Sequence, residues 1–484
     1  MDSYSSAIFH SPFGHSDFGF EVSRELPLAH NRPAKGVHCT LCDGGGVSRG
    51  PTGLLEARHM RGASPPLRGI MLVVLALAVP VSAEEVRPAT DADKPPQKNS
   101  AADAAEWPNW RGPNHDGIST ERGWLTAWPK EGPGQLWKAE LGTGYSSVTV
   151  SAGKVYSMGA ARGQDTVFCL NADTGEVVWK HSYPCAVQEN YPGTRSTPTV
   201  DGTAVYTLSM DGQAFCLDAL SGQVVWSRNL KKELGLDLPR HKFASSPIVE
   251  GELLLFNMGT DGLALDKKTG DPVWKSSGDS SYASPVPFTL GGRRCAAIFA
   301  WSRLLVVESA NGQKIASYDW VTEYHENVAD PVVTGDKIFI SSNYGRGCAL
   351  VRVGEGGAAA VWQNKNLSSY FASPVLVGDC IYGFHVSAWM KDDLVCLSVK
   401  DGSVQWRQKN VTAGGLMAAD GKLIVLSRTG ELILVEASPA AYTEIARAKV
   451  LSTGECSTPP VLSGGRIYAR NIKGTLVCLD VRGK

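Results

Sequence analysis

The segment that decides the fold is Cys169-Leu-Asn-Ala-Asp-Thr-Gly-Glu-Val-Val-Trp179, because three close copies of it follow along the chain. The copies end at Trp226, Trp274 and Trp406, and each has a Gly four residues before the Trp. A Gly among small polar residues favours a tight turn, and the alternating Val and Trp that follow favour a strand. Each copy therefore predicts a β-hairpin, and a second apolar hairpin upstream makes one repeat four strands.

Weaker copies extend the pattern along the rest of the chain, and two half copies lie at the ends of the repeat region. Leu476-Val-Cys-Leu-Asp480 stops before any Trp, whereas the strand at 134–141 contains Trp137 but has no partner before it. The Trp-equivalent positions are then 137, 179, 226, 274, 316, 362, 406 and 446, at intervals of 40 to 48 residues. Such a period is typical of a repeat architecture.

These repeats predict an all-β fold, an eight-bladed β-propeller with four-stranded antiparallel blades, closed by pairing of the N- and C-terminal strands. An aromatic residue at a fixed repeat position is expected to pack between neighbouring blades. We assign this structural role to the blade tryptophans Trp137, Trp179, Trp226, Trp274, Trp362 and Trp406.

The propeller is expected to occupy residues 107–484 as one domain. Residues 60–83 combine positive charge, a short apolar run and a small-x-small end, which indicates a secretory signal peptide. The Pro-, Ala-, Asp- and Lys-rich residues 84–106 are expected to be a disordered linker, and residues 1–59 a doubtful, disordered upstream extension. No Cys lies at the cleavage point, so we expect an exported protein, periplasmic or extracellular, without a lipid anchor or a transmembrane helix in the mature chain.

Composition narrows the class of partner. Lys and Arg number 47 against 48 Asp and Glu, which gives a net charge of −1, and no polybasic run appears. A nucleic-acid partner would leave an electrostatic footprint, so none is expected.

Nine cysteines follow the signal. An odd number argues against a full disulfide framework, although one or two bridges stay possible.

The Asp-x-x-Thr-Gly-x-x-x-Trp hairpin resembles that of the pyrroloquinoline quinone (PQQ)-like, or quinoprotein-type, propeller family. This family includes PQQ-dependent alcohol dehydrogenases and the non-catalytic outer-membrane assembly factor BamB. The segment Trp107-Pro-Asn-Trp-Arg-Gly-Pro113 is also similar to the exported PQQ-like repeat proteins of planctomycete-type bacteria. The resemblance implies a vicinal Cys-Cys pair, an Asp base and calcium ligands in the dehydrogenases, and this chain has no Cys-Cys pair.

Loops that lead from one blade to the next gather at one face of a propeller, around the central channel, where ligands usually bind. The aromatic and charged residues of these loops are Tyr145, Tyr191, Arg195, His241, Lys242, Tyr282, His325, Glu326, Tyr370 and Glu455. Asp330 adds a carboxylate where the other repeats have Ser or Thr before Pro. We select Tyr145, Arg195, His241, Tyr282, His325, Glu326 and Asp330 as candidates for binding a ligand or partner at the channel mouth.

Two functions follow from this interpretation. The first is a non-catalytic binding or scaffold module in the cell envelope, with an envelope protein or polymer as partner. We expect this module to be a monomer and to need no cofactor or metal. The alternative is an enzyme at the channel mouth, either a hydrolase or a quinoprotein oxidoreductase that uses PQQ and calcium. No catalytic residue can be assigned from the sequence under either function.

Overall fold

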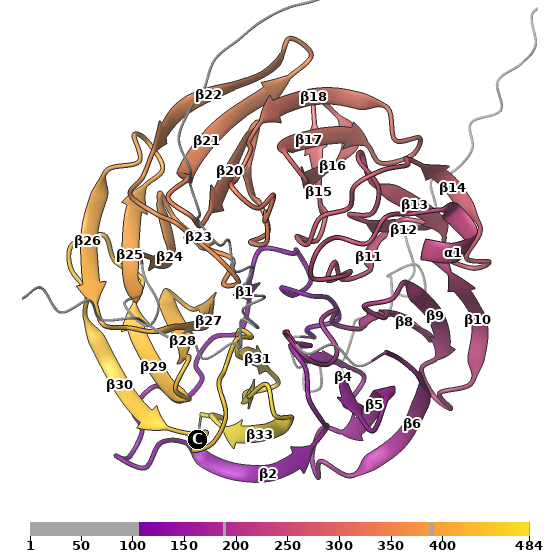
Figure 1. Ribbon diagram of the computed structural model, residues 1–484. Helices are drawn as coiled ribbons and strands as arrows, with labels where there is room; N and C mark the ends of the chain where they lie inside the picture. Colours follow the sequence, from indigo (N-terminus) through magenta and orange to yellow (C-terminus); the bar gives the residue numbers. More distant parts are fainter. Residues whose placement is uncertain (1–105, 187–189, 388–391, 484) are drawn as a thin grey trace, which may run out of the picture. The chain divides into compact units, whose positions relative to one another are not determined.

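The computed structural model describes residues 106–186, 190–387 and 392–483, and nearly all of its regular structure is β-strand. Eight sheets surround a central axis in Figure 1, each with four antiparallel strands, and one of them has the short β1 as an additional parallel strand. The predicted eight-bladed propeller is therefore confirmed. One short helix, α1 (Leu230–Leu234), follows β10. The described residues contain no helix with the length and apolar character needed to cross a membrane.

Each blade runs from an inner strand near the axis to an outer strand at the rim. Blades 1 and 2 comprise β3 (Thr149–Ser151), β4 (Lys154–Ala161), β5 (Gln164–Asn171), β6 (Val177–Pro184), β7 (Thr199–Asp201), β8 (Ala204–Leu208), β9 (Gln213–Asp218) and β10 (Val224–Asn229). Blades 3 and 4 comprise β11 (Ile248–Glu250), β12 (Leu253–Phe256), β13 (Leu263–Asp266), β14 (Pro272–Lys275), β15 (Val286–Leu290), β16 (Arg293–Ala300), β17 (Arg303–Glu308) and β18 (Lys314–Asp319).

The second half of the ring repeats this order. Blades 5 and 6 comprise β19 (Val332–Thr334), β20 (Lys337–Ser342), β21 (Gly347–Gly354), β22 (Gly357–Asn364), β23 (Val375–Val377), β24 (Cys380–Val386), β25 (Asp392–Ser398) and β26 (Val404–Lys409). Blades 7 and 8 comprise β27 (Ala413–Ala419), β28 (Lys422–Ser427), β29 (Glu431–Glu436), β30 (Glu444–Lys449), β31 (Val461–Ser463), β32 (Arg466–Arg470), β33 (Thr475–Asp480) and β2 (Gly134–Glu140).

Blade 8 closes the ring as the two half copies predict. Its sheet order is β2-β33-β32-β31, and Trp137 lies opposite Cys478 in the antiparallel pair. Arg470 of β32 strengthens the junction with blade 1, because its buried guanidinium donates hydrogen bonds to the carbonyl oxygens of Ser146 at 2.7 Å and Met158 at 2.8 Å. Strands from opposite ends of the chain thus complete one blade.

All eight outer strands shift register at the same place. In blade 1, Val177 pairs with Leu170 and Trp179 with Cys169, so Val178 is the extra residue of a β-bulge. The bulge leaves both Val177 and Val178 exposed while Trp179 turns inward. Because bulges twist an edge strand, they protect the outer rim of the propeller from pairing with other chains.

The repeated Trp and Gly form contacts between consecutive blades. Trp137 Nε1 donates a hydrogen bond to Ala172 O of the next blade at 2.9 Å. Gly175, at φ +74°, lies under the same indole ring, and a Cβ there would come within 2.6 Å of Trp137 Cδ2. Trp179, Trp226, Trp274 and Trp362 lie on the next blade's turn glycine in the same way, and Trp406 donates to Ser438 O at 2.7 Å. In the repeats that keep both residues, the Gly therefore contacts the preceding blade and the Trp the following one.

The two faces of the ring differ. The interblade loops lie on one face, which we call the mouth face, and the turns of the Gly-x-x-x-Trp hairpins lie on the other. The residues before β2 cross that second face: Pro108 O accepts a hydrogen bond from Val200 N at 2.8 Å, and Glu121 accepts one from Gly464 N at 2.6 Å. Between these points β1 (Ile118–Ser119) pairs in parallel with β27, near the centre of Figure 1. This segment closes the channel opposite the mouth.

The predicted upstream extension, signal peptide and nearly all of the linker lie outside the described residues. Glu106, the last residue of the expected linker, is described: its carboxylate accepts hydrogen bonds from Ser151 Oγ and Ala152 N, each at 3.0 Å. The folded part therefore begins no later than Glu106.

Candidate functional site

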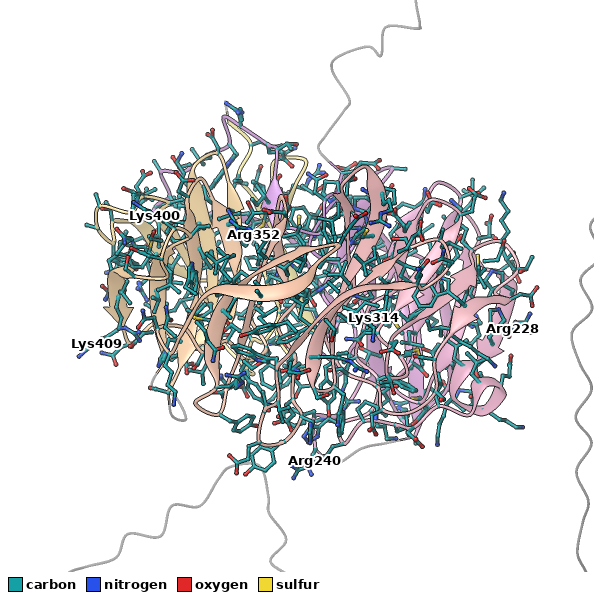
Figure 2. All side chains as sticks on the ribbon, turned by 90° about the horizontal axis from the view of Figure 1, so that it is seen from above. Arg228, Arg240, Lys314, Arg352, Lys400 and Lys409 are labelled. Carbon is teal, nitrogen blue, oxygen red and sulfur yellow. The ribbon has the colours of Figure 1, made fainter. Side chains whose placement is uncertain are left out.

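A cavity of about 110 Å³ lies at the axis, open toward the mouth face. Six of the seven residues selected from the sequence line it: Tyr145, Arg195, His241, Tyr282, Glu326 and Asp330. Figure 2 shows the ring from its side, with Arg240 of the neighbouring loop on the lower, mouth face and Lys400 of the β25–β26 turn toward the upper face. The interblade loops therefore bring residues from five blade junctions to one site.

His325 is the exception among the seven candidates. Its ring is stacked on Trp301, with centroids 4.7 Å apart and an interplanar angle of 7°. His325 has φ +55°, which turns its side chain away from that of the adjacent Glu326. His325 therefore does not line this cavity, and its role in binding at the channel mouth stays a prediction.

Glu326 lies at the centre of a hydrogen-bond network on one wall of the cavity. Its Oε1 lies 3.1 Å from His241 Nε2, and its Oε2 accepts hydrogen bonds from Tyr344 and Tyr370, each at 2.9 Å. Burial alone would raise the pKa of Glu326, but these three donors outweigh burial and lower it. The site thus holds a buried carboxylate in its charged form.

Asp330 belongs to a ladder of hydrogen bonds that links the inner ends of the blades. The backbone N–H of one blade donates to a side-chain oxygen of the next, as in Thr197 N to Ser246 Oγ and Ser246 N to Ser284 Oγ, each at 3.0 Å. Asp330 Oδ1 occupies the same place and accepts from Ser284 N at 2.7 Å. Oδ1 therefore replaces the hydroxyl acceptor of the other blades, and Oδ2 remains available for a second hydrogen bond.

That second oxygen binds the segment that closes the channel. Trp110 Nε1 donates to Asp330 Oδ2 at 2.5 Å, and Trp110 forms part of the cavity's inner end. Burial raises the pKa of Asp330, although the positive charge of the buried Arg111 opposes this. Arg111 donates to Pro374 O at 2.6 Å. Asp330 therefore joins blades 4 and 5 to the segment that ends the cavity.

Arg195 holds the loop that forms another wall. Its Nη2 donates to Tyr191 O at 2.5 Å, and its Nη1 lies 2.9 Å from Met210 Sδ. Burial lowers the pKa of the guanidinium. Arg195 fixes Tyr191, which itself has φ +52°, against His241 with ring centroids 4.8 Å apart. The guanidinium thus has a positioning role in the loop.

The other loop residues noted in the sequence divide into two groups. Tyr191 and Tyr370 line the cavity, whereas Lys242 forms an ion pair with Asp211 at 2.7 Å and Glu455 forms one with Arg428 at 2.5 Å. Sequence reasoning missed Trp110, because it lies outside the repeats, and Phe371, because an apolar residue in a repeat is expected in the core. It also missed Tyr344, which lies in a turn within blade 5 and not between blades.

Aromatic side chains form a continuous path across the mouth. Tyr324 and Tyr344 are exposed at its outer end, and their ring centroids are 4.8 Å apart. The path continues through Tyr370 and Phe371, 4.0 Å apart, to Tyr191 in the cavity. Exposed aromatic rings that continue into a pocket are typical of recognition surfaces.

The structure describes nine free thiols, eight of them buried, at the cysteines that follow the expected signal. Burial raises the pKa of the repeat-position thiols, for example that of Cys169 to about 11, so they are poorly reactive packing residues. Within residues 106–186, 190–387 and 392–483, no group of three or more His, Cys, Asp or Glu side chains is arranged to hold a metal ion.

A buried carboxyl in blade 1 allows the electrostatic contribution of one group to stability to be measured. Asp165 of β5 is 1% exposed, and burial raises its pKa from 3.8 to about 6, although the neighbouring Cys185 thiol opposes this. Because the folded-state pKa of Asp165 is raised, its contribution to the free energy of unfolding is most favourable below about pH 4. This contribution falls as the pH rises to about 6.

We expect Asp165→Asn to remove that pH dependence and to raise the free energy of unfolding at pH 7 by about 2–3 kcal/mol, since one pKa unit is worth about 1.4 kcal/mol. Urea unfolding between pH 4 and pH 7 measures the effect, with the exposed Asp279→Asn as the control. An unchanged pH profile in Asp165→Asn would contradict this view of the carboxyl.

The sequence matches the family model described as "Outer membrane protein assembly factor BamB" over residues 121–277, 165–408 and 390–484. These overlapping matches cover most of the chain. The chain belongs to this PQQ-like repeat family. The family assignment agrees with the hairpin and ring closure described above. A comparison with curated protein sequences finds no significant match.

Solved structures share the fold at low sequence identity. BamB from Moraxella catarrhalis is 16% identical, with a TM-score of 0.55, and the match covers 72% of this chain and 97% of that one. Quinohemoprotein alcohol dehydrogenase from Comamonas testosteroni is 12% identical, with a TM-score of 0.59, over 78% of this chain and 81% of that one. At these identities the likeness establishes the propeller alone.

The residues around the cavity do not fit PQQ, the cofactor that the resemblance suggests for the alternative function. PQQ is a fused-ring tricarboxylate and needs cationic partners, whereas Glu326 and Asp330 face this cavity with Arg195 as the guanidinium among its lining residues. The charge of the lining therefore disfavours the quinone.

Proposed function

We propose that this chain is an exported, non-catalytic propeller that acts as a binding module in the cell envelope and presents its mouth face to a partner protein or polymer. The partner contacts the rim around Arg240 and Tyr344, and the cavity accepts one group of that partner. No bond is made or broken in this role.

One observation carries the proposal: the polar groups of the cavity are already engaged in holding its walls. Glu326 interacts with three side chains, and Asp330 accepts from Ser284 N and Trp110 Nε1. General acid–base catalysis needs a group free to exchange a proton with substrate. Carboxylates committed to the fold instead favour a preorganised binding surface.

The proposal is tested by affinity capture from envelope fractions of the native cells. Arg240→Glu and Lys400→Glu are matched charge reversals of exposed residues near the mouth face and in a hairpin turn of the other face. We expect wild type and Lys400→Glu to recover the same partner and Arg240→Glu to recover at least tenfold less. Equal recovery by all three proteins, or no reproducible partner, would count against the mouth face as a binding surface.

The oxidoreductase alternative is tested separately with purified protein, PQQ and Ca²⁺. We expect neither stoichiometric quinone binding nor reduction of an electron-accepting dye with alcohol substrates. Saturable quinone binding accompanied by dye reduction would replace the binding-module proposal with an enzyme.

A further inference from the structure

The mouth cavity combines a buried negative charge with aromatic walls and a closed inner end. Glu326 is 3% exposed. Among the described residues, its ion-pair partner is His241, whose imidazole is charged only when protonated. A buried charge is costly unless a group of opposite charge accompanies it. The cavity therefore favours an occupant that brings positive charge.

The unused hydrogen-bonding capacity of Glu326 limits the kind of cation. A carboxylate offers about four lone-pair positions, and His241, Tyr344 and Tyr370 occupy three of them. One position remains for a new donor. A guanidinium binds carboxylates best through two parallel hydrogen bonds, whereas an ammonium needs only one acceptor at each N–H. The one remaining lone-pair position of Glu326 therefore favours an ammonium group over a guanidinium.

The walls suit the same ligand. Aromatic rings attract cations over their faces, and several rings together form the cages that bind alkylated ammonium groups. The aromatic residues that line the cavity are Trp110, Tyr145, Tyr191, Tyr282, Tyr370 and Phe371. A cavity of about 110 Å³ accommodates a head group with a few methylenes.

Arg195 also lines the cavity, and its charge opposes a second cation. Its guanidinium is turned toward the loop, where Nη2 donates to the carbonyl oxygens of Tyr191 and Asn190. Asp330 is balanced by Arg111 behind it, which leaves Glu326 and Arg195 as the opposite charges of the lining. Because loop carbonyl oxygens engage Arg195, Glu326 remains the anionic group that a cation can approach.

We propose that the mouth cavity binds a primary alkylammonium group, supplied by a lysine side chain of the partner, between Glu326 and the aromatic walls. This inference rests on the proposed function, because it names the group through which the partner is held. The exposed path of Tyr324 and Tyr344 contacts the residues next to that lysine.

The test uses n-butylammonium as a probe of the lysine side chain, with n-butylguanidinium and neutral n-pentanol as comparisons. Saturation-transfer NMR of the full propeller measures each Kd. We expect n-butylammonium to bind in the millimolar range, at least tenfold more tightly than n-pentanol and more tightly than n-butylguanidinium. Equal binding of n-pentanol, or no binding of n-butylammonium at about 100 mM, would overturn the inference.

Variants locate the site. Glu326→Gln should weaken n-butylammonium at least tenfold, whereas Glu323→Gln, an exposed residue of the same loop, should leave the Kd unchanged. Tyr370→Phe keeps the aromatic ring and frees one lone pair of Glu326, so it should bind the probe at least as tightly as wild type. Tyr370→Phe therefore provides an independent test if Glu326→Gln does not fold. Weaker binding by Tyr370→Phe, or an unchanged Kd in folded Glu326→Gln, would contradict the site.

The same probe separates the two proposals. Saturating n-butylammonium should release the captured partner, and n-pentanol should not. A partner that is captured but not released would overturn the lysine inference and leave the binding module intact. Probe binding without any partner would count against the binding module, while the cavity's preference for ammonium would stand as binding of a free amine.

Discussion

Replacing Trp137 by alanine is expected to lower the free energy of unfolding by about 3–5 kcal/mol, the usual cost of removing a buried aromatic side chain. Trp137 is 7% exposed, packs beside Tyr468 with ring centroids 5.8 Å apart, and covers Gly175 of the next blade. It also lies on β2, the strand that closes the ring against β33. Its loss therefore weakens both the closing blade and the contact between blades 8 and 1. Urea unfolding measures the change.

Val178→Ala provides the control, because Val178 is the exposed bulge residue beside another blade tryptophan. Exposed substitutions of this kind usually change stability by less than about 0.5 kcal/mol. If Trp137→Ala cost no more than Val178→Ala, the closure of the ring through β2 would be wrong.

Replacing Asp330 by alanine should cost about 2–6 kcal/mol, since it leaves two buried N–H groups without their acceptor, at about 1–3 kcal/mol each. The variant leaves Ser284 N–H and the Trp110 indole N–H without their acceptor and Arg111 without the carboxylate that faces it. Asp330→Ser restores the hydroxyl found in the other blades, so it should keep the bond to Ser284 and recover part of the loss.

Ser373→Ala is the matched control for this ladder position. Ser373 Oγ accepts from Asp330 N at 2.9 Å, and losing one such neutral hydrogen bond costs about 1 kcal/mol. Chemical unfolding of the three variants should rank Asp330→Ala above Asp330→Ser and Ser373→Ala. Equal losses in Asp330→Ala and Ser373→Ala would show that the carboxylate does not hold the closing segment.

The repeats allowed most of the fold to be predicted, because each blade uses the same residues for the same contacts. The Gly175 turn and Trp179 are read directly from the pattern, and the half copies identified the pairing of Trp137 with Cys478. Asp330 was identifiable because it departs from Ser or Thr at a fixed repeat position. The β-bulges were not predicted, since an extra residue in one strand does not change the apolar pattern of the hairpin.

The cavity could be predicted only in part. Loop residues such as Glu326 were placed at the mouth by their position in the repeat, but their hydrogen-bond partners were not. Trp110 contacts Asp330, a residue 220 positions away, through a segment that occurs once in the chain. No period reveals such a contact. The positive φ of His325 likewise has no signal in the sequence.

Site-specific photo-cross-linking in native cells tests the central claim, that the mouth face binds the partner. A photoreactive amino acid replaces Arg240 in one variant and Lys400 in the other, two exposed positions that Figure 2 shows on different faces. We predict that the Arg240 variant forms a discrete cross-linked complex and that the Lys400 variant does not. Cross-linking from Lys400 alone, or equally from both positions, would contradict the account.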